Sequence, residues 1–223
     1  MQFLSNAVTD KFPDDRVSSF FHVSLDGCRD IVQPITLFCV LDTLEEALSG
    51  HIDQILREGD IVKIDLGACY KGYHGDSART IPVGKVSDEA AKLIEVTRNS
   101  FFAGVGQLKA GNRLGDVGSA IDTLVKENGF STVRKYIGHG IGKEVHEAPD
   151  VPNYGTPGRG VRICSGMVLA IEPMVNAGTF EVRELADGWT VVTADRKLSA
   201  HYENTVALTD EGVLNLTLVD QDF

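Results

Sequence analysis

The clearest hydrophobic pattern in the chain lies near its middle and predicts two helices. Apolar side chains recur every three to four residues from Ala90 to Leu108 and again from Leu114 to Val125, which is the spacing of an amphipathic helix. Ser87, followed by two acids, suits the start of the first helix, since a hydroxyl can cap it and acids favour the first turn. Gly111-Asn112 separates the two helices and Asn128-Gly129 ends the second.

Stretches rich in β-branched residues lie on both sides of the helices and predict strands. Upstream, residues 61–66 and 78–83 read as two strands of a hairpin whose connection covers residues 67–75. Downstream, the predicted strands are residues 133–137, 168–175, 180–185, 189–193 and 202–208. This order of elements predicts an α+β domain in which helices cover one face of a curved antiparallel sheet.

Composition narrows the possible functions. The 223 residues include 32 acids and 21 Lys and Arg, for a net charge of −11, and an acidic chain repels phosphate backbones, so we expect no direct nucleic-acid binding. The opening stretch MQFLSNAVTDKFPDDRV lacks a basic region followed by an apolar run, and no apolar stretch is long enough to span a bilayer. We therefore expect a cytoplasmic protein that does not enter a membrane, with its four cysteines reduced.

Two acids in the predicted hairpin are the first candidates for chemistry. A symmetrical hairpin centred between Tyr70 and Lys71 places Asp65 opposite Asp76 on one face of adjacent strands. Two carboxylates about 5 Å apart repel by roughly 3 kcal/mol at an effective dielectric near 20. A cation between them or a proton on one of them would remove this repulsion. The alternative is a different register in which both acids face water.

Two further acids lie in predicted strands. Glu172 stands within the apolar run LAIEPMV, and Glu203 lies in HYENTVA. A glutamate in an apolar strand is rarely left unpaired. Ordinary salt bridges with Arg183 or Arg196 would be the simplest explanation. A shared cationic centre is the other.

Histidines supply a nitrogen ligand for such a centre. His139 lies between two glycines in GHGIG, and His146 follows where a loop begins. The glycine run does not match a phosphate-binding loop, because the Lys-Ser/Thr ending is missing. One imidazole and four carboxylates suit Mn²⁺, Fe²⁺ or Co²⁺, with Zn²⁺ also acceptable, and two such ions balance four negative charges. Two neighbouring metals can share and activate a water molecule.

These residues lie in motifs that resemble a known enzyme family. The motifs are KIDLG around Asp65, GYHGDSART around Asp76, GHGIG around His139, IEPM around Glu172 and SAHYENTV around Glu203. Their order is similar to that of the type I methionine aminopeptidases. The resemblance implies the pita-bread fold, an α+β fold with pseudo-twofold halves around a dinuclear metal centre. It assigns residues 59–223 to the metallopeptidase catalytic domain and leaves residues 1–58 unassigned.

The resemblance also implies the role of each metal-binding residue. Asp65 would chelate one ion, Asp76 and Glu203 would bridge both ions, and His139 and Glu172 would bind the other. Glu172 would in addition serve as the general base toward the bridging hydroxide, which attacks the peptide carbonyl.

Two more residues match substrate-binding positions of the family. His146 matches the histidine that contacts the scissile amide, and Trp189 in DGWTV matches an aromatic residue of the methionine pocket. The implied activity is removal of N-terminal methionine from peptides whose second residue is small. The implied partner is the N-terminus of a peptide or nascent chain, which allows association with the ribosome, and the implied oligomeric state is a monomer.

Upstream of Leu56 the resemblance ends. The family carries a His-Gly-Ile-Pro-like motif before the first ligand, whereas Ala47 stands near that position here and His51 has different neighbours. Two alternatives therefore stay open: a pita-bread protein that binds without catalysis, and an Xaa-Pro dipeptidase or aminopeptidase P of the same fold. The Glu-Pro-Met sequence at residues 172–174 favours the methionine enzymes over the Xaa-Pro enzymes.

Overall fold

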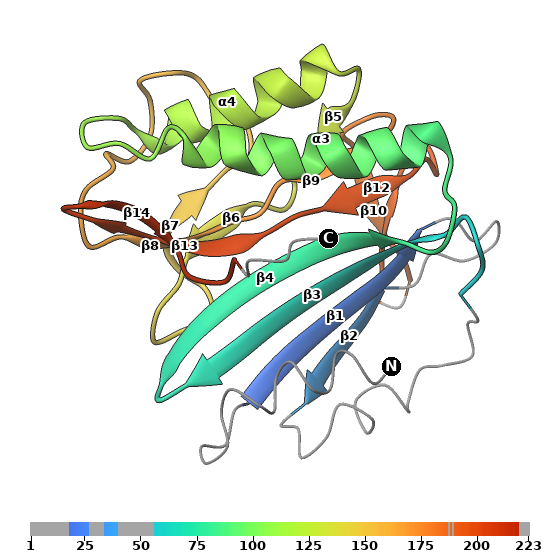
Figure 1. Cartoon of the computed structure of the whole chain (residues 1–223), viewed down its shortest axis with the longest axis horizontal. Coiled ribbons are helices and arrows are strands. Elements are labelled where there is room, and N and C mark those ends of the chain that lie inside the picture. The colour runs from blue at the N-terminus through green and yellow to red at the C-terminus, as the bar shows by residue number, and fades with distance from the viewer. Residues whose placement is uncertain (1–17, 27–33, 40–55, 187, 189, 219–223) are drawn as a thin grey trace.

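A computed structural model of the whole chain describes residues 18–26, 34–39, 56–186, 188 and 190–218. Its elements are β1 (Ser18–Asp26), β2 (Pro34–Cys39), β3 (Ile61–Tyr70), β4 (Tyr73–Pro82), α3 (Asp88–Val105), α4 (Leu114–Glu127), β5 (Ser131–Thr132), β6 (Gly138–Gly140), β7 (Glu147–Val151), β8 (Val168–Ile171), β9 (Met174–Asn176), β10 (Val182–Glu184), β11 (Val191–Thr193), β12 (Ser199–His201), β13 (Asn204–Thr209) and β14 (Gly212–Asn215). Figure 1 shows the two helices on one side of the strands.

The first sheet has the strand order β2-β1-β3-β4, and all of its pairs are antiparallel. The β3–β4 hairpin turns at Lys71 and Gly72, whose φ angles are 51° and 79°, as a two-residue type I′ turn requires. The turn therefore lies one residue later than predicted, and both strands are longer. Asp65 pairs with Ala78 and Asp76 pairs with Gly67, so the prediction that the two acids lie directly opposite is wrong.

The acids nevertheless share a face of the sheet. Successive side chains in a strand alternate between faces, so Asp65 and Gly67 point to the same side, and Asp76 opposite Gly67 points there too. The two acids are thus diagonal neighbours, a separation at which side chains on adjacent strands still interact.

A second sheet has the order β14-β13-β8-β6-β7, and a three-stranded sheet has the order β12-β9-β5. The predicted strand over residues 168–175 is two strands in different sheets, β8 and β9, because Pro173 lacks the N–H that a continuous ladder would need. The predicted strand over residues 133–137 is wrong. That segment connects β5 to β6, which belong to different sheets.

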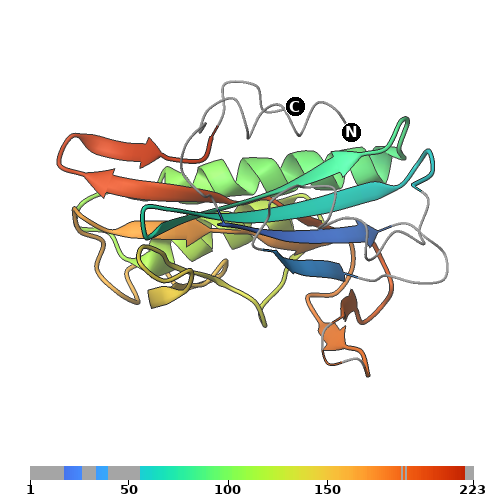
Figure 2. The same cartoon turned by 90° about the horizontal axis from the view of Figure 1, so that it is seen from below.

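The two predicted helices are confirmed, and they cover the sheets with apolar faces. The Ser87 hydroxyl caps α3 by accepting a hydrogen bond from the backbone N–H of Ala90 (3.2 Å). The core joins helix residues to strands β8, β9 and β13; its fully buried members include Leu93, Phe101, Val117, Ile121, Leu169, Ile171, Val175 and Val206. In Figure 2 the helices form one layer behind the strands, and the small β10–β11 hairpin extends away from the rest.

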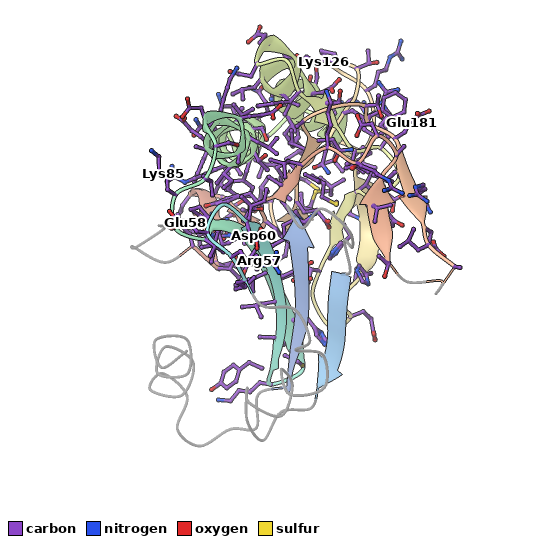
Figure 3. The ribbon with its side chains drawn as sticks, turned by 90° about the vertical axis from the view of Figure 1, so that its right-hand side faces the viewer. Arg57, Glu58, Asp60, Lys85, Lys126 and Glu181 are labelled. Atoms are coloured by element: carbon purple, nitrogen blue, oxygen red, sulfur yellow. The ribbon has the colours of Figure 1, made fainter. Side chains whose placement is uncertain are left out.

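The start of β3 is fixed by a short local network. The backbone N–H of Arg57 donates to the Asp60 carboxylate (2.8 Å), and the backbone groups of Gly59 and Asp60 bond to Val83 at the end of β4. Figure 3 shows Arg57, Glu58 and Asp60 close together at this point, beside Lys85. The hairpin that carries Asp65 and Asp76 is therefore tied at its open end as well as at its turn.

Within the described ranges, neither helix has the length and apolar character needed to cross a membrane.

Candidate metal centre

The five predicted ligands come from both sheets. Asp65 lies in β3 and Asp76 in β4, His139 is the middle residue of β6, Glu172 follows β8, and Glu203 precedes β13. The acids therefore occupy strands or the residues immediately beside them, where pairing fixes the backbone on which each side chain stands.

Backbone hydrogen bonds join the two sheets at the site. The N–H of Ala78 donates to the carbonyl of Glu203 (3.3 Å), and the N–H of Glu203 donates to the carbonyl of Ala78 (2.9 Å). This pairing brings β4 beside the start of β13, as Figure 1 shows. One ligand atom each from Asp76, His139 and Glu203 lie within 4.8 Å of one another as a result.

His139 reaches the cluster because its strand is flanked closely on both sides. A Cβ atom added at Gly138 would lie 2.3 Å from the carbonyl oxygen of Ala170, and one added at Gly140 would lie 2.3 Å from that of Ala148. Nδ1 of His139 lies 2.9 Å from the Gly140 carbonyl, so it carries the proton, since a carbonyl only accepts. Nε2 is left as a lone-pair nitrogen, the form in which imidazole binds metals.

Glu172 connects His139 to another histidine. Its Oε1 lies 3.4 Å from Nε2 of His139, and its Oε2 lies 3.8 Å from Nε2 of His201. His201 also lies 4.0 Å from Oε2 of Glu203. His201 was not among the predicted site residues. Its signal in the sequence is its position two residues before Glu203 in an extended segment, which places both side chains on one face.

The cluster concentrates negative charge in a place that water reaches poorly. Burial, followed by repulsion from neighbouring carboxylates, holds the pKa of Asp65, Glu172 and Glu203 well above the usual carboxyl range. Burial also raises the pKa of Asp76. Asp65 shares side-chain hydrogen bonds with Asp76 and Glu203, and two carboxyl groups can do so only when one of them holds a proton.

The side chains present fit divalent cations. Oδ1 of Asp76 is buried without a hydrogen-bond partner, and a buried acceptor in that state requires a ligand or a cost in free energy. Among the described residues, neither Arg183 nor Arg196 forms an ion pair with Glu172 or Glu203, and both arginines are exposed. Carboxylates with one imidazole suit borderline-hard divalent ions, and two such ions would neutralise four carboxylates.

His146 lies at the rim of this cluster. Its ring centroid is 4.4 Å from that of His139, at an interplanar angle of 66°, and the residue keeps contact with solvent. Partial burial is the main cause that lowers the pKa of His146, so the ring is neutral at neutral pH. Trp189, the other predicted substrate contact, lies outside the described residues.

Sequence comparison finds relatives over most of the chain. The model of metallopeptidase family M24 matches residues 36–210. The chain is 58% identical over 164 residues to a methionine aminopeptidase of Clostridium perfringens, covering 74% of this chain and 66% of that protein. It is 53% identical over 166 residues to methionine aminopeptidase 1 of Bacillus subtilis, covering 74% and 67%. The matched region thus spans about two thirds of the length of these relatives.

Solved structures agree with the sequence comparison. The fold is similar to that of a methionine aminopeptidase from Thermotoga maritima, with a TM-score of 0.77 and 40% identity over 89% of this chain and 74% of that one. It is also similar to a prolidase from Pyrococcus furiosus, with a TM-score of 0.59 and 28% identity over 76% of this chain and 44% of that one. Both the TM-score and the sequence identity are therefore higher for the methionine aminopeptidase than for the prolidase.

Proposed function

Because this chain belongs to metallopeptidase family M24, we propose that it is an aminopeptidase that removes the N-terminal methionine from peptides and nascent proteins with a small second residue. The observation that carries the proposal is the convergence of Asp76, His139 and Glu203 from both sheets, with Glu172 against His139. The curated relatives supply the substrate class.

The proposed centre would hold two divalent ions. Asp65 would bind one, His139 and Glu172 would bind the other, and Asp76 and Glu203 would each offer both carboxylate oxygens to the pair. Mn²⁺, Fe²⁺ and Co²⁺ suit this donor set, and Zn²⁺ is acceptable. When bound, the ions would supply Lewis acidity and lower the pKa of a coordinated water.

The protein's own groups then handle protons and orientation. Glu172 takes the proton of the attacking water and passes it to the leaving amine, acting first as a general base and then as a general acid. His146 is neutral and partly exposed beside His139. It can therefore donate a hydrogen bond to the scissile amide and to the oxygen that gains charge in the transition state.

The remaining parts of the proposal concern the setting of the enzyme. The partner is the N-terminus of a peptide or nascent chain, with association with the ribosome as one route to it, and the protein is a cytoplasmic monomer. Trp189 contributes to the methionine pocket. Residues 59–223 form the catalytic domain. Of the preceding segment, β1 pairs with β3, and β2 pairs with β1 at the edge of the same sheet.

Hydrolysis of Met-Gly-Met-Met by the full chain tests the proposal. With added Mn²⁺ or Co²⁺ we expect release of free methionine and no cleavage of an Xaa-Pro dipeptide. Glu203→Gln, assayed in parallel, should release none. Cleavage of the Xaa-Pro dipeptide instead would assign the chain to the prolidase branch. No cleavage of either peptide by protein that binds metal would identify a binding protein that keeps the fold.

A further inference from the structure

Where the two sheets meet, threonine hydroxyls on either side of the seam form hydrogen bonds with backbone groups of the opposite sheet. Along this seam β4 runs antiparallel to residues 201–205. Figure 1 shows β4 beside β12 and β13, the strands to which these residues belong or which they join. Ala78 and Glu203 pair through their backbones at its centre. On one side of that pair, the Thr80 hydroxyl bonds both backbone groups of His201 (2.8 and 2.9 Å).

The second of these threonines holds Asp76. The Thr205 hydroxyl accepts a hydrogen bond from the backbone N–H of Asp76 (2.7 Å) and donates one to the Asp76 carbonyl (3.0 Å). Thr205 is 1% exposed, so water cannot take over either bond. The peptide groups on both sides of the Asp76 Cα are thus fixed by one hydroxyl.

The Thr205 hydroxyl bonds Asp76, whereas the Thr205 backbone has other partners. Thr205 pairs with Ala170 in β8, and its N–H donates to the hydroxyl of Thr217 (3.0 Å). A side chain reaches farther than a carbonyl, so β4 and β13 can diverge at Asp76 while both polar groups of the Asp76 backbone stay bonded. The Thr217 hydroxyl also lies 3.4 Å from the Asp76 carbonyl and supports the same point.

We propose that Thr205 is a positioning residue of the metal centre, which directs the Asp76 carboxylate toward Glu203 and His139 by holding the Asp76 backbone. This inference rests on the proposed function, in which Asp76 bridges two ions. We expect that removal of the Thr205 hydroxyl, which touches no metal, weakens metal binding. Partners of metal ligands that act in this way typically change affinity by about 10- to 100-fold when they are removed.

Calorimetric titration of the metal-free protein with Mn²⁺ tests the proposal. In Thr205→Val, which keeps the shape and removes the hydroxyl, we expect Mn²⁺ affinity to fall at least about tenfold. Thr205→Ser restores the hydroxyl and should bind close to wild type. The visible absorption of the Co²⁺-loaded protein should shift in Thr205→Val and return in Thr205→Ser, because it reports the geometry of the ligands.

Thr97→Val is the matched control. Thr97 is also 1% exposed, and its hydroxyl bonds the Leu93 carbonyl within α3 (2.7 Å), a helix that carries none of the predicted ligands. This variant should lose some thermal stability and keep the Mn²⁺ affinity of the wild type. Equal loss of affinity in Thr97→Val and Thr205→Val would overturn the proposal, because the effect would then follow stability.

The outcomes distinguish failure of the proposed metal centre from failure of the positioning role of Thr205. If the wild-type protein binds no Mn²⁺, the metal centre itself is wrong. If the wild type binds Mn²⁺ and Thr205→Val binds it equally well, the positioning role alone is wrong. Should Thr205→Val not fold, Thr217→Val decides: weaker Mn²⁺ binding supports the role at Asp76, and unchanged binding overturns it.

Discussion

At the scale of single residues, Asp76 and Glu203 are two acids whose side chains lie close together in the protein interior. Glu203 is 2% exposed, and its pKa is raised first by burial and then by Asp76. Both side chains lie within 4.8 Å of His139 through one atom each. Their carboxylates are therefore held where they repel each other unless protons or cations are present.

Asp76→Asn and Glu203→Gln are each expected to abolish methionine release. The amide keeps the size of the side chain and loses the negative charge and one of the two acceptor oxygens. Metal content by mass spectrometry should fall in parallel with activity toward Met-Gly-Met-Met. Wild-type turnover in either variant would refute the bridging assignment.

His146→Ala separates catalysis from metal binding. Because His146 lies beside His139 and keeps contact with solvent, we expect kcat to fall about 100-fold, as for loss of one donor to a developing negative charge. Mn²⁺ affinity should change little. Loss of metal as the main effect would mean that His146 belongs among the ligands.

At this scale a residue is predictable as a candidate for a site where its chemistry does not match its surroundings. Glu172 and Glu203 were identified because they interrupt apolar strands, and the structure places each beside a histidine. His201 does not stand out in the same way, because a histidine in a partly apolar segment is common. Thr205 was also missed, because its function depends on a neighbour 129 positions away in the chain.

At the scale of elements, the close packing of β6 fixes the position of His139, a proposed metal ligand. The strand lies between β7 and β8 in the five-stranded sheet, and the backbones approach so closely at Gly138 that a Cβ would lie 2.3 Å from a carbonyl oxygen. A side chain there must push the strands apart. The position of His139 thus depends on the absence of a side chain next to it.

Gly138→Ala is therefore expected to lower both stability and metal affinity. Overpacking of this kind costs about 1–3 kcal/mol in the free energy of unfolding, and displacement of β6 should weaken Mn²⁺ binding through His139. Urea denaturation and calorimetry measure the two effects. Gly106→Ala is the control, because Gly106 has an ordinary φ of −59° and a Cβ there would lie 3.4 Å from its nearest atoms. Equal effects in both variants would contradict the account.

Element predictions succeeded where one period ran through a long segment. The helices followed a 3.6-residue period over several turns, and α3 and α4 confirm them. The hairpin register failed because the turn depends on two residues with positive φ, Lys71 and Gly72, of which only glycine gives a local signal. The strand predicted at residues 133–137 failed because β propensity does not reveal where a chain changes sheets.

At the scale of the whole molecule, two sheets meet at a buried cluster of like charges. The family predicted from the five motifs is confirmed, and so is the pita-bread α+β class. The sequence could not reveal how the sheets meet, because the Ala78–Glu203 pairing joins residues far apart in the chain. Residues 1–58 had no predicted element, and β1 and β2 lie there.

The metal-free protein should become less stable as the pH rises. Because the pKa values of Asp65, Glu172 and Glu203 are raised, the folded chain holds protons that the unfolded chain has already released above about pH 4.5. The stability linked to these groups is fully present below the ordinary carboxyl pKa and is lost as the pH rises through the raised values.

Thermal melts of chelator-treated protein between about pH 5 and 8 measure this trend. Glu203→Gln should flatten it, because one of the buried acids no longer titrates. Mn²⁺ should raise the melting temperature most at the upper end of this range, since metal ions replace the protons. A melting temperature that rises with pH in the absence of metal would contradict the account.

Anomalous scattering from a crystal of the full chain grown with Mn²⁺ shows whether five side chains from two sheets hold a pair of divalent ions. We expect two manganese peaks, each within bonding distance of both Asp76 and Glu203, with Asp65 on one ion and with His139 and Glu172 on the other. Absence of manganese from this cluster, with lysine or arginine side chains neutralising the acids instead, would contradict it.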